Sequence, residues 1–323
     1  MIFNRLKAVW NPELYHGWGK KNKFFEGWYY KIVSKDQDYA FAFIPGIAMD
    51  ENGLKQAFIQ ILDGKKLKSS YIKFSFDEFK PNPSVHDIII GKNRFKINSI
   101  ELNLPDVKGK LIFNDIVPWS KSFFSPGIMG PFSFLPFMEC YHGILSMNHS
   151  INGELIINKN KINFDSGRGY IEKDWGHSFP LGYVWMQSNH FSKSEISFKL
   201  SVAKIPMKGF SFVGFIAGVF VNSELIEFTT YNFSNLRKCS ISKEEVSIEM
   251  DNNKYKLIVK AIRSKSTKLA APIQGFMDSR IEESMNSKIN LVLIDKKRNK
   301  SIIDDIGSSA CIEVAGNYSL LLK

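Results

Sequence analysis

The chain has 323 residues, a formal net charge of +11, and a composition that is 44% hydrophobic and 14% aromatic. That length suits one large or two ordinary domains, and the hydrophobic content excludes a disordered chain. The charge comes from scattered Lys residues without a long basic block, and no zinc finger, basic zipper or RNP-like aromatic motif accompanies it. We therefore expect no nucleic-acid partner, which leaves composition drift or attraction to anionic lipid headgroups as the origin of the charge.

The cysteines and the N-terminal residues indicate the cellular compartment in which we expect the protein. The three Cys are far apart and show neither a disulfide framework nor metal-ligand spacing, which fits a reducing environment. Arg5 and Lys7 precede no apolar segment of the signal-peptide kind. The longest apolar run, residues 210–221, is shorter than the roughly 20 residues of a membrane-spanning helix. A cytoplasmic location is predicted, with peripheral contact to a membrane surface as an open alternative.

The first notable segment reads Phe-Phe-Glu-Gly-Trp-Tyr-Tyr over residues 24–30. On a strand, alternate side chains point to the same side, so Glu26, Trp28 and Tyr30 would share one face. An acid among rings on one face is unusual for a plain core.

Residues 118–139 interrupt the strand pattern. They contain four Pro, two Gly and six Phe or Trp residues, and only Lys121 and Glu139 are charged. Proline at this density excludes a central strand, and a long apolar loop is usually functional. We predict an irregular apolar lid at a pocket mouth or at the junction of two halves, with an inter-domain packing plug as the alternative. The predicted domains are residues 1–160 and 161–323.

The second half of the chain alternates apolar and polar residues at period two, as over residues 196–202, 246–250 and 257–262. This pattern is typical of strands, and Asn152-Gly153 is a hairpin turn signal. The best helix candidate is residues 274–285. We expect an all-β fold of two barrel or sandwich halves, in which strand exceeds helix by at least about twofold.

Two further segments combine polar and aromatic side chains on one strand face. Strand parity groups the following residues: Tyr170, Glu172 and Asp174 in one segment, and Tyr183, Trp185, Gln187 and Asn189 in the other. The Cα atoms of Glu172 and Asp174 would lie about 7 Å apart, with both carboxyl groups on the same face. Such faces, if they line a barrel interior, form an aromatic pocket with a few polar groups, as in small-molecule sites.

A carboxyl group in such a pocket would have its pKa raised by desolvation and could act as a general acid near neutral pH. The alternative is a solvated face on which Lys31 or Lys173 pairs with the acids. His177 and His190 are more often structural, and the sequence shows no metal-ligand set, phosphate loop or nucleophile elbow. We predict no metal and no cofactor.

Several stretches together resemble the tocopherol cyclase-like family. They are Asn11-Pro12 with Tyr15-His16-Gly17 and residues 25–31, then residues 130–142, residues 169–180 with 185–191, and residues 271–293. The most specific is Gly-Tyr-Ile-Glu-Lys-Asp-Trp-Gly at residues 169–176. The family pattern has Asn where this chain has Asp174, so Glu172 becomes the stronger acid candidate.

The resemblance implies two lipocalin-like halves related to carotenoid hydratases. It also implies a reaction in which a proton adds to a trisubstituted alkene and a phenol oxygen or water captures the cation. Glu26 or Glu172, beside Asp174, would supply the proton. The rings that would face the cation are those of Trp28, Trp175 and Trp185. The polar side chains that would orient the nucleophile are those of Gln187, Asn189 and His190.

The predicted function is therefore acid-catalysed cyclisation or hydration of an isoprenoid alkene such as a prenylated quinol. A lipocalin-like carrier of an apolar lipid or isoprenoid, without chemistry, needs the same apolar pocket and stays an open alternative. Buried acids favour the enzyme, because a carrier gains nothing from an unpaired buried carboxyl group. A peripheral membrane scaffold is the third alternative, and it depends only on charge and on residues 118–139.

Overall fold

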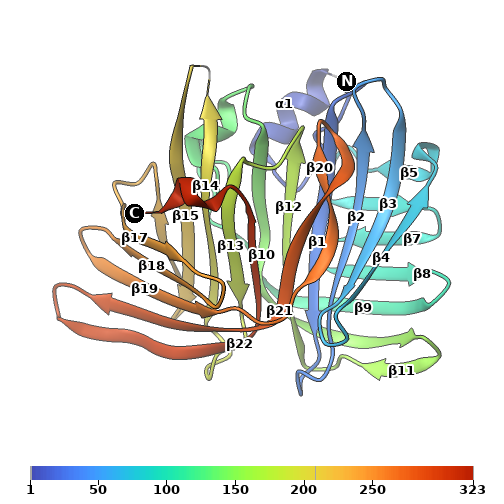
Figure 1. Ribbon diagram of the computed structural model, residues 1–323. Coiled ribbons are helices and arrows are strands. Elements are labelled where there is room, and N and C mark those ends of the chain that lie inside the picture. Colours follow the sequence, from blue (N-terminus) through green and yellow to red (C-terminus); the bar gives the residue numbers. More distant parts are fainter. Residues whose placement is uncertain (1, 208, 323) are drawn as a thin grey trace. The chain divides into compact units, whose positions relative to one another are not determined.

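The computed structural model describes residues 2–207 and 209–322. It is 63% strand and 6% helix, so the predicted all-β fold with little helix is confirmed (Figure 1). The one α-helix of the described residues is α1 (Ile2–Trp10), and none of their helices is long and apolar enough to cross a membrane. The chain forms two compact units, Met1–Phe179 with Leu269–Arg280, and Pro180–Lys268 with Ile281–Lys323.

The first unit is built on an antiparallel sheet in the order β4-β3-β2-β1-β12-β10-β9-β8-β7-β6-β5, with β11 paired to β10. Its strands are β1 (Phe24–Val33), β2 (Ala40–Met49), β3 (Lys55–Asp63), β4 (Lys68–Phe74), β5 (Phe79–Pro81), β6 (Asp87–Ile90), β7 (Asn93–Lys96), β8 (Ser99–Asn103), β9 (Val107–Val117), β10 (Cys140–Ile157), β11 (Asn160–Asn163) and β12 (Gly167–Gly176). Two 3₁₀ turns join them, η1 (Phe76–Glu78) and η2 (Gly130–Phe134).

The core of this unit follows the period-two alternation of β1 and β12. Trp28 and Tyr30 of β1 face the core together with Ile171 and Trp175 of β12. Glu26 has the same parity as Trp28, so its carboxyl group points to the core side of the sheet as well.

The second unit holds an antiparallel sheet in the order β16-β15-β14-β13-β22-β21-β19-β18-β17, with β20 paired to β21. The strands of this sheet are β13 (Gly182–Ser188), β14 (Ser197–Met207), β15 (Phe210–Val221), β16 (Glu224–Thr229), β17 (Asn235–Ile241), β18 (Glu245–Asp251), β19 (Tyr255–Ile262), β20 (Thr267–Ile273), β21 (Phe276–Asp295) and β22 (Lys300–Gly316), followed by η3 (Tyr318–Leu321). Most of β20 and the start of β21 lie within Leu269–Arg280 and so belong to the first unit. Val184 and Met186 of β13 join its core, so Tyr183 and Trp185 point to the opposite face.

Three predictions about organisation have different outcomes. The unit boundary lies at Phe179/Pro180 rather than at 160/161, because β12 is paired between β1 and β10 and cannot leave the first sheet. The helix expected over residues 274–285 is wrong, since Phe276 onward is part of the strand β21. Residues 118–139 are irregular, as predicted, with η2 as their helical turn.

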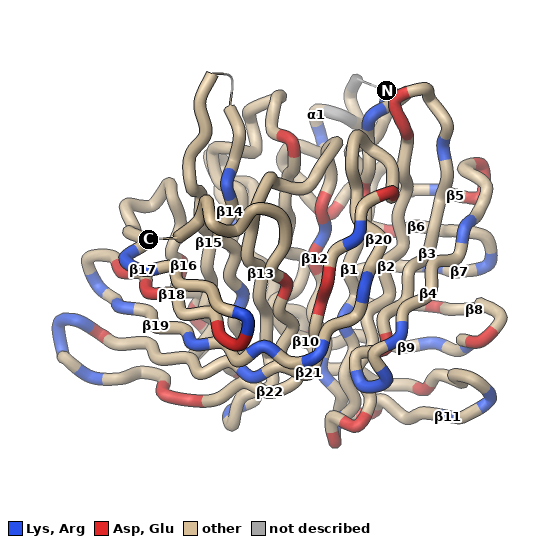
Figure 2. Tube along the Cα trace, in the orientation of Figure 1, with Lys and Arg blue, Asp and Glu red and all other residues tan. Residues whose placement is uncertain are grey.

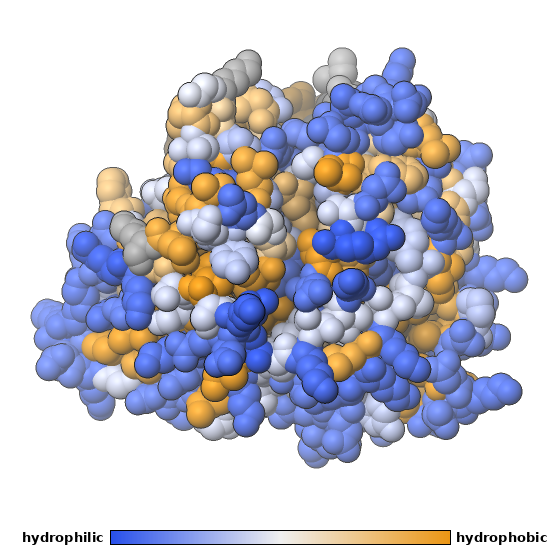
Figure 3. Space-filling model, in the orientation of Figure 1, coloured by the Kyte–Doolittle hydropathy of each residue, from blue (hydrophilic) through white to orange (hydrophobic). Residues whose placement is uncertain are grey.

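Charged and apolar residues are spread over the chain. Figure 2 shows Lys and Arg along both units without a continuous basic stretch, in agreement with the sequence. Figure 3 shows apolar residues in several separate areas among hydrophilic ones on the visible face.

Candidate functional site

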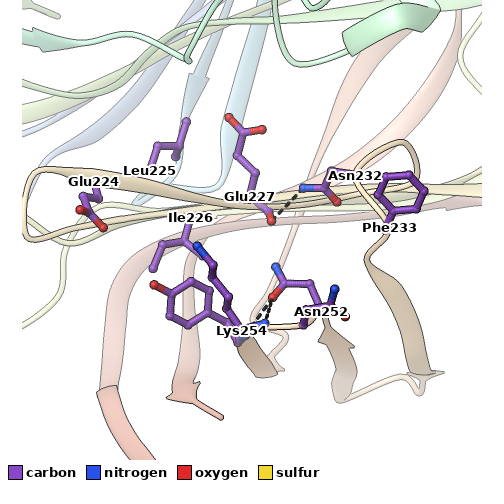
Figure 4. Close-up of a pocket in the computed structure, with 10 residues that line it drawn as sticks. Glu224, Leu225, Ile226, Glu227, Asn232, Phe233, Asn252 and Lys254 are labelled. Carbon is purple, nitrogen blue, oxygen red and sulfur yellow. Dashed lines mark hydrogen bonds between the residues drawn. The ribbon is translucent and has the colours of Figure 1, made fainter. Parts of the chain in front are cut away.

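A surface pocket of the second unit contains none of the predicted residues (Figure 4). It has a volume of about 460 Å³ and is lined by parts of β16, the loop around Phe233 and the turn before β19. Burial raises the pKa of Glu227, but Phe233, which also lines the pocket, is 91% exposed. This open pocket therefore brings none of the predicted acids or aromatic residues together.

Glu26 lies in an ion-pair cluster, defined here as Glu26, Lys173 and His16, in which the side chain of His16 is 11% exposed. Cross-strand pairing of Trp28 with Lys173 brings Lys173 to the same face of the sheet as Glu26. The Lys173 ammonium donates to Glu26 Oε1 and, over 2.5 Å, to the carbonyl of Leu14. Both Glu26 and Lys173 are 0% exposed. Glu26 and Lys173 therefore form a buried ion pair on the core side of the first sheet.

The N-terminal segment completes the shell around Glu26. The backbone N–H groups of His16 and Gly17 donate to Glu26 Oε2 over 2.9 and 3.2 Å. Burial opposes the charged form, but the charge of Lys173 and the hydrogen bonds from His16 lower the pKa of Glu26 below its ordinary value. The expected raised pKa is wrong for Glu26, because four donor contacts hold it as a carboxylate.

The tryptophans beside this cluster already face a cation. Lys173 Nζ lies 4.7 Å from the ring centroids of both Trp28 and Trp175, and the His16 ring stacks on Trp175 at 4.0 Å. Cation–π contacts of this kind stabilise a desolvated ammonium. The rings of Trp28 and Trp175 thus contact the protein's own lysine, and the expectation that they face a substrate cation stays a prediction.

Tyr30 lies deeper in the same core. Its hydroxyl is 2.5 Å from His86 Nε2 and donates to the Lys96 carbonyl over 3.2 Å. Burial raises the pKa of Tyr30 well above its ordinary value and, with the charge of Lys173, lowers the pKa of His86 to about 4. Tyr30 therefore belongs to the core packing of the first unit.

A second cluster, called here the imidazole–carboxylate cluster, consists of His142, Glu172, Asp174 and Tyr170. It lies on the opposite face of β12, because Glu172 pairs with Tyr29 across the strands while Glu26 pairs with Trp175. His142 Nδ1 lies 2.6 Å from Asp174 Oδ1, and His142 Nε2 lies 3.5 Å from Glu172 Oε2. The imidazole thus lies between two carboxyl groups.

Tyr170, the remaining member of the cluster, lies on β12 together with Glu172. The Tyr170 hydroxyl donates to Glu172 Oε2 over 2.5 Å. Glu172 is 5% exposed, and the side chains of His142 and Asp174 are 14% and 27% exposed. The cluster combines one buried carboxyl group with two groups that solvent still reaches, and such an arrangement can hold and exchange protons.

His142 was not among the predicted site residues. The sequence places it 30 residues before Glu172, and its role is visible only once β10 and β12 pair and set His142 opposite Asp174. One donor atom from each of His142, Glu172 and Asp174 lies within 4.8 Å of the others, a spacing at which a divalent cation could bind.

Glu26 and Glu172 do not meet in one cavity. They occupy opposite faces of the β1–β12 pair, so the expectation that both acid-bearing faces converge is wrong for these two residues. Strand parity separates them, because Glu26 is in register with Trp175, three residues from Glu172.

The third predicted segment belongs to the second unit. Tyr183, Trp185 and Gln187 are buried on the face of β13 opposite the core residues Val184 and Met186. Tyr183 donates its hydroxyl proton to the carboxylate of Glu313 on β22.

Just beyond β13, Asn189 and His190 are also buried, and the His190 carbonyl accepts from Ser308 N over 2.9 Å. The ligand-binding roles of all these second-unit residues stay predictions.

Two lipocalin-like β halves define the fold class, and solved structures agree. The fold is similar to that of CghA in complex with Sch210972, with a TM-score of 0.58, 8% identity, and coverage of 91% of this chain and 88% of the other. It is also similar to kievitone hydratase from Nectria haematococca, with a TM-score of 0.52, 10% identity, and coverage of 91% and 89%. At these identities the likeness shows the fold alone.

The family is shown by sequence. The family model described as Tocopherol cyclase-like matches residues 110–316, more than half of the chain, so the protein belongs to the tocopherol cyclase-like family. No curated protein sequence matches it. The matched range includes the whole imidazole–carboxylate cluster and excludes Glu26.

Proposed function

We propose that this protein is an enzyme that protonates an isoprenoid alkene and guides capture of the cation by an internal phenol oxygen or by water. The observation that carries the proposal is the His142 imidazole held between Asp174 at 2.6 Å and Glu172 at 3.5 Å. Membership of the tocopherol cyclase-like family supports the substrate class. The name of the similar kievitone hydratase supports hydration as the related outcome.

Glu172 is the proposed proton donor. Its carboxyl proton adds to the less substituted alkene carbon, the π electrons form the new C–H bond, and a tertiary cation remains. The phenol or water oxygen then forms a C–O bond and loses its own proton to the Glu172 carboxylate. Cyclisation is thus an isomerisation and hydration adds one water, and neither gains or loses electrons.

The neighbours of Glu172 have distinct proposed tasks. Asp174 accepts the Nδ1–H of His142 and so fixes the imidazole with Nε2 toward Glu172. His142 can then exchange a proton with Glu172 between turnovers. Tyr170 orients the carboxyl group through its 2.5 Å hydrogen bond.

Glu26 is a weaker donor candidate than Glu172. Its pKa is lowered, and a carboxylate paired with Lys173 has no proton to give near neutral pH. Its fully buried position among backbone donors is that of a structural anchor. The proposal therefore assigns catalysis to the imidazole–carboxylate cluster.

The test uses a prenylated hydroquinone in D₂O, with products separated by liquid chromatography and mass spectrometry. Alkene protonation places one non-exchangeable deuterium on carbon in the chromanol or the tertiary alcohol. Glu172→Gln keeps the shape but removes the transferable proton, so turnover should fall by about 10²–10⁴-fold with ligand binding retained.

The matched control is Glu154→Gln, which changes a half-exposed glutamate of β10 that pairs with Lys161. It should leave turnover unchanged. Binding of the quinol without any deuterated product would favour the lipid carrier over the enzyme. A large loss of stability in Glu172→Gln, with activity per folded molecule unchanged, would make Glu172 a structural residue.

A further inference from the structure

Helix α1 exposes apolar residues to solvent. Phe3, Leu6 and Trp10 follow the i, i+3, i+7 spacing of one helix face and are 80%, 57% and 39% exposed. Ala8, on the other side, is 1% exposed, and its carbonyl lies 3.0 Å from His16 Nε2. Ala8 therefore holds the helix against the first unit, whereas Phe3, Leu6 and Trp10 are exposed to solvent.

Residues 118–139 extend this apolar face. The Trp10 ring lies 6.2 Å from the Phe123 ring and 5.5 Å from the Phe134 ring, centroid to centroid, and Trp10 Nε1 donates to the Phe123 carbonyl over 3.3 Å. Phe123 and Phe124 contact each other at 5.1 Å and are 70% and 74% exposed. We call the continuous surface of these residues the apolar cap, formed by Phe3, Leu6, Trp10, Phe123, Phe124 and Phe134.

The two segments that form the apolar cap have a positive net charge. Residues 1–23 and 118–139 contain six Lys or Arg residues and two Glu residues. One of the acids, Glu13, is paired with Lys121 over 2.7 Å. The first turn of α1 has no acidic residue, and its last turn carries Lys7. The excess of cations in the two segments that carry the exposed rings matches an anionic lipid surface.

We propose that the apolar cap is a membrane-docking surface that inserts into the headgroup region of a bilayer containing anionic lipid. Large exposed apolar patches mark interaction sites, and a short helix with Phe, Leu and Trp on one face is typical of interfacial binding. Trp10 has the amphipathic ring that favours the bilayer interface, with its N–H already bonded. This proposal does not depend on the proposed reaction.

A bilayer fits the apolar cap better than a second protein does. The two most exposed loop rings, Phe123 and Phe124, meet edge to face at 90° and project from an irregular segment. Protein interfaces are depleted of Lys and require complementary shape, whereas a fluid lipid surface accepts separate protruding rings on segments with a positive net charge.

The test is co-sedimentation of the purified full chain with phosphatidylcholine vesicles, with and without phosphatidylglycerol. The wild type should bind the anionic vesicles more tightly, and added salt should weaken this binding. The double variant Phe123→Ser/Phe124→Ser should lower the partition coefficient at least about tenfold, because two rings no longer enter the interface. Leu6→Ser tests the helix in the same way.

The matched control is Leu54→Ser/Ile156→Ser, which removes two exposed apolar side chains of the first unit outside the apolar cap. It should bind vesicles like the wild type. Circular dichroism melting confirms that each variant is folded. Absence of wild-type binding to anionic vesicles, or equal binding by Phe123→Ser/Phe124→Ser, would overturn the proposal. A dimer in sedimentation velocity that this variant dissolves, without vesicle binding, would assign the surface to a second copy instead.

Discussion

His142 and Asp174 face each other across β10 and β12, and their side chains meet at 2.6 Å on the sheet face that points away from the core of the first unit. The pair is a direct consequence of register. A shift of one residue in β12 would place Lys173 opposite His142 and turn Asp174 to the core side. The same register sets Glu172 and Tyr170 beside the imidazole.

The first prediction concerns this pair. Asp174→Leu keeps about the size of the side chain but removes the oxygen that accepts from the His142 ring. We expect turnover of the prenylated hydroquinone to fall about 10- to 100-fold, as for other partners that fix a histidine. The melting temperature should change little, because the Asp174 side chain is 27% exposed. Equal turnover of wild type and variant would remove Asp174 from the mechanism.

Glu26→Gln should act on stability instead of on chemistry. The change leaves Lys173 buried without its carboxylate, and breaking a buried ion pair from one side costs about 3–5 kcal/mol of unfolding free energy. Urea unfolding measures the loss. Glu154→Gln breaks an exposed pair with Lys161 and should cost less than about 1 kcal/mol. A Glu26→Gln protein as stable as wild type would contradict the role of anchor.

Stability should also depend on pH through buried histidines. Burial lowers the pKa of His149 to about 3, whereas in the unfolded chain it titrates near 6.5. Below 6.5 the unfolded state binds a proton that the folded state does not, so stability is full above pH 6.5 and falls as pH drops toward 3. One such histidine contributes about 1.4 kcal/mol per pH unit within this window.

The measurement is the unfolding free energy from urea titrations between pH 4 and 6 (about the middle of that window). In His149→Gln, the slope of the unfolding free energy against pH should fall by the contribution of about one proton, whatever the effect of the change on overall stability. His177→Gln serves as the control, since the His177 side chain is 37% exposed. An unchanged slope in His149→Gln would mean that His149 is protonated in the folded protein.

Much of the fold was predictable because strands carry a period-two signal. The alternation over residues 196–202 and 257–262 falls in β14 and β19, as expected. The helix α1 was missed, since its exposed face is apolar and its nine residues lack the usual polar outer face. The boundary was misplaced because the partners of β12 are far away in sequence.

The site was predictable only in part. Strand parity correctly grouped Tyr170, Glu172 and Asp174 on one face, where Tyr170 binds Glu172 and Asp174 binds His142. The sequence offered Lys173 as a partner of the acids, but on a solvated face. It could not show that Lys173, 147 residues away, would pair with Glu26 in the core, or that residues 16 and 17 would supply backbone donors. Partners that pairing brings from distant segments decide whether a buried acid carries a charge.

The last prediction distinguishes proton transfer from metal chemistry at the imidazole–carboxylate cluster. His142, Glu172 and Asp174 could together hold a divalent cation, yet the proposed step uses a proton from Glu172. We expect EDTA to leave turnover of the wild type unchanged. Added Zn²⁺ should inhibit, because it would occupy the imidazole and carboxylate atoms that must exchange protons. His142→Asn should weaken this inhibition by removing one ligand, while Glu154→Gln should not. Loss of turnover in EDTA, restored by a divalent cation, would replace the proton mechanism with a metal-dependent one.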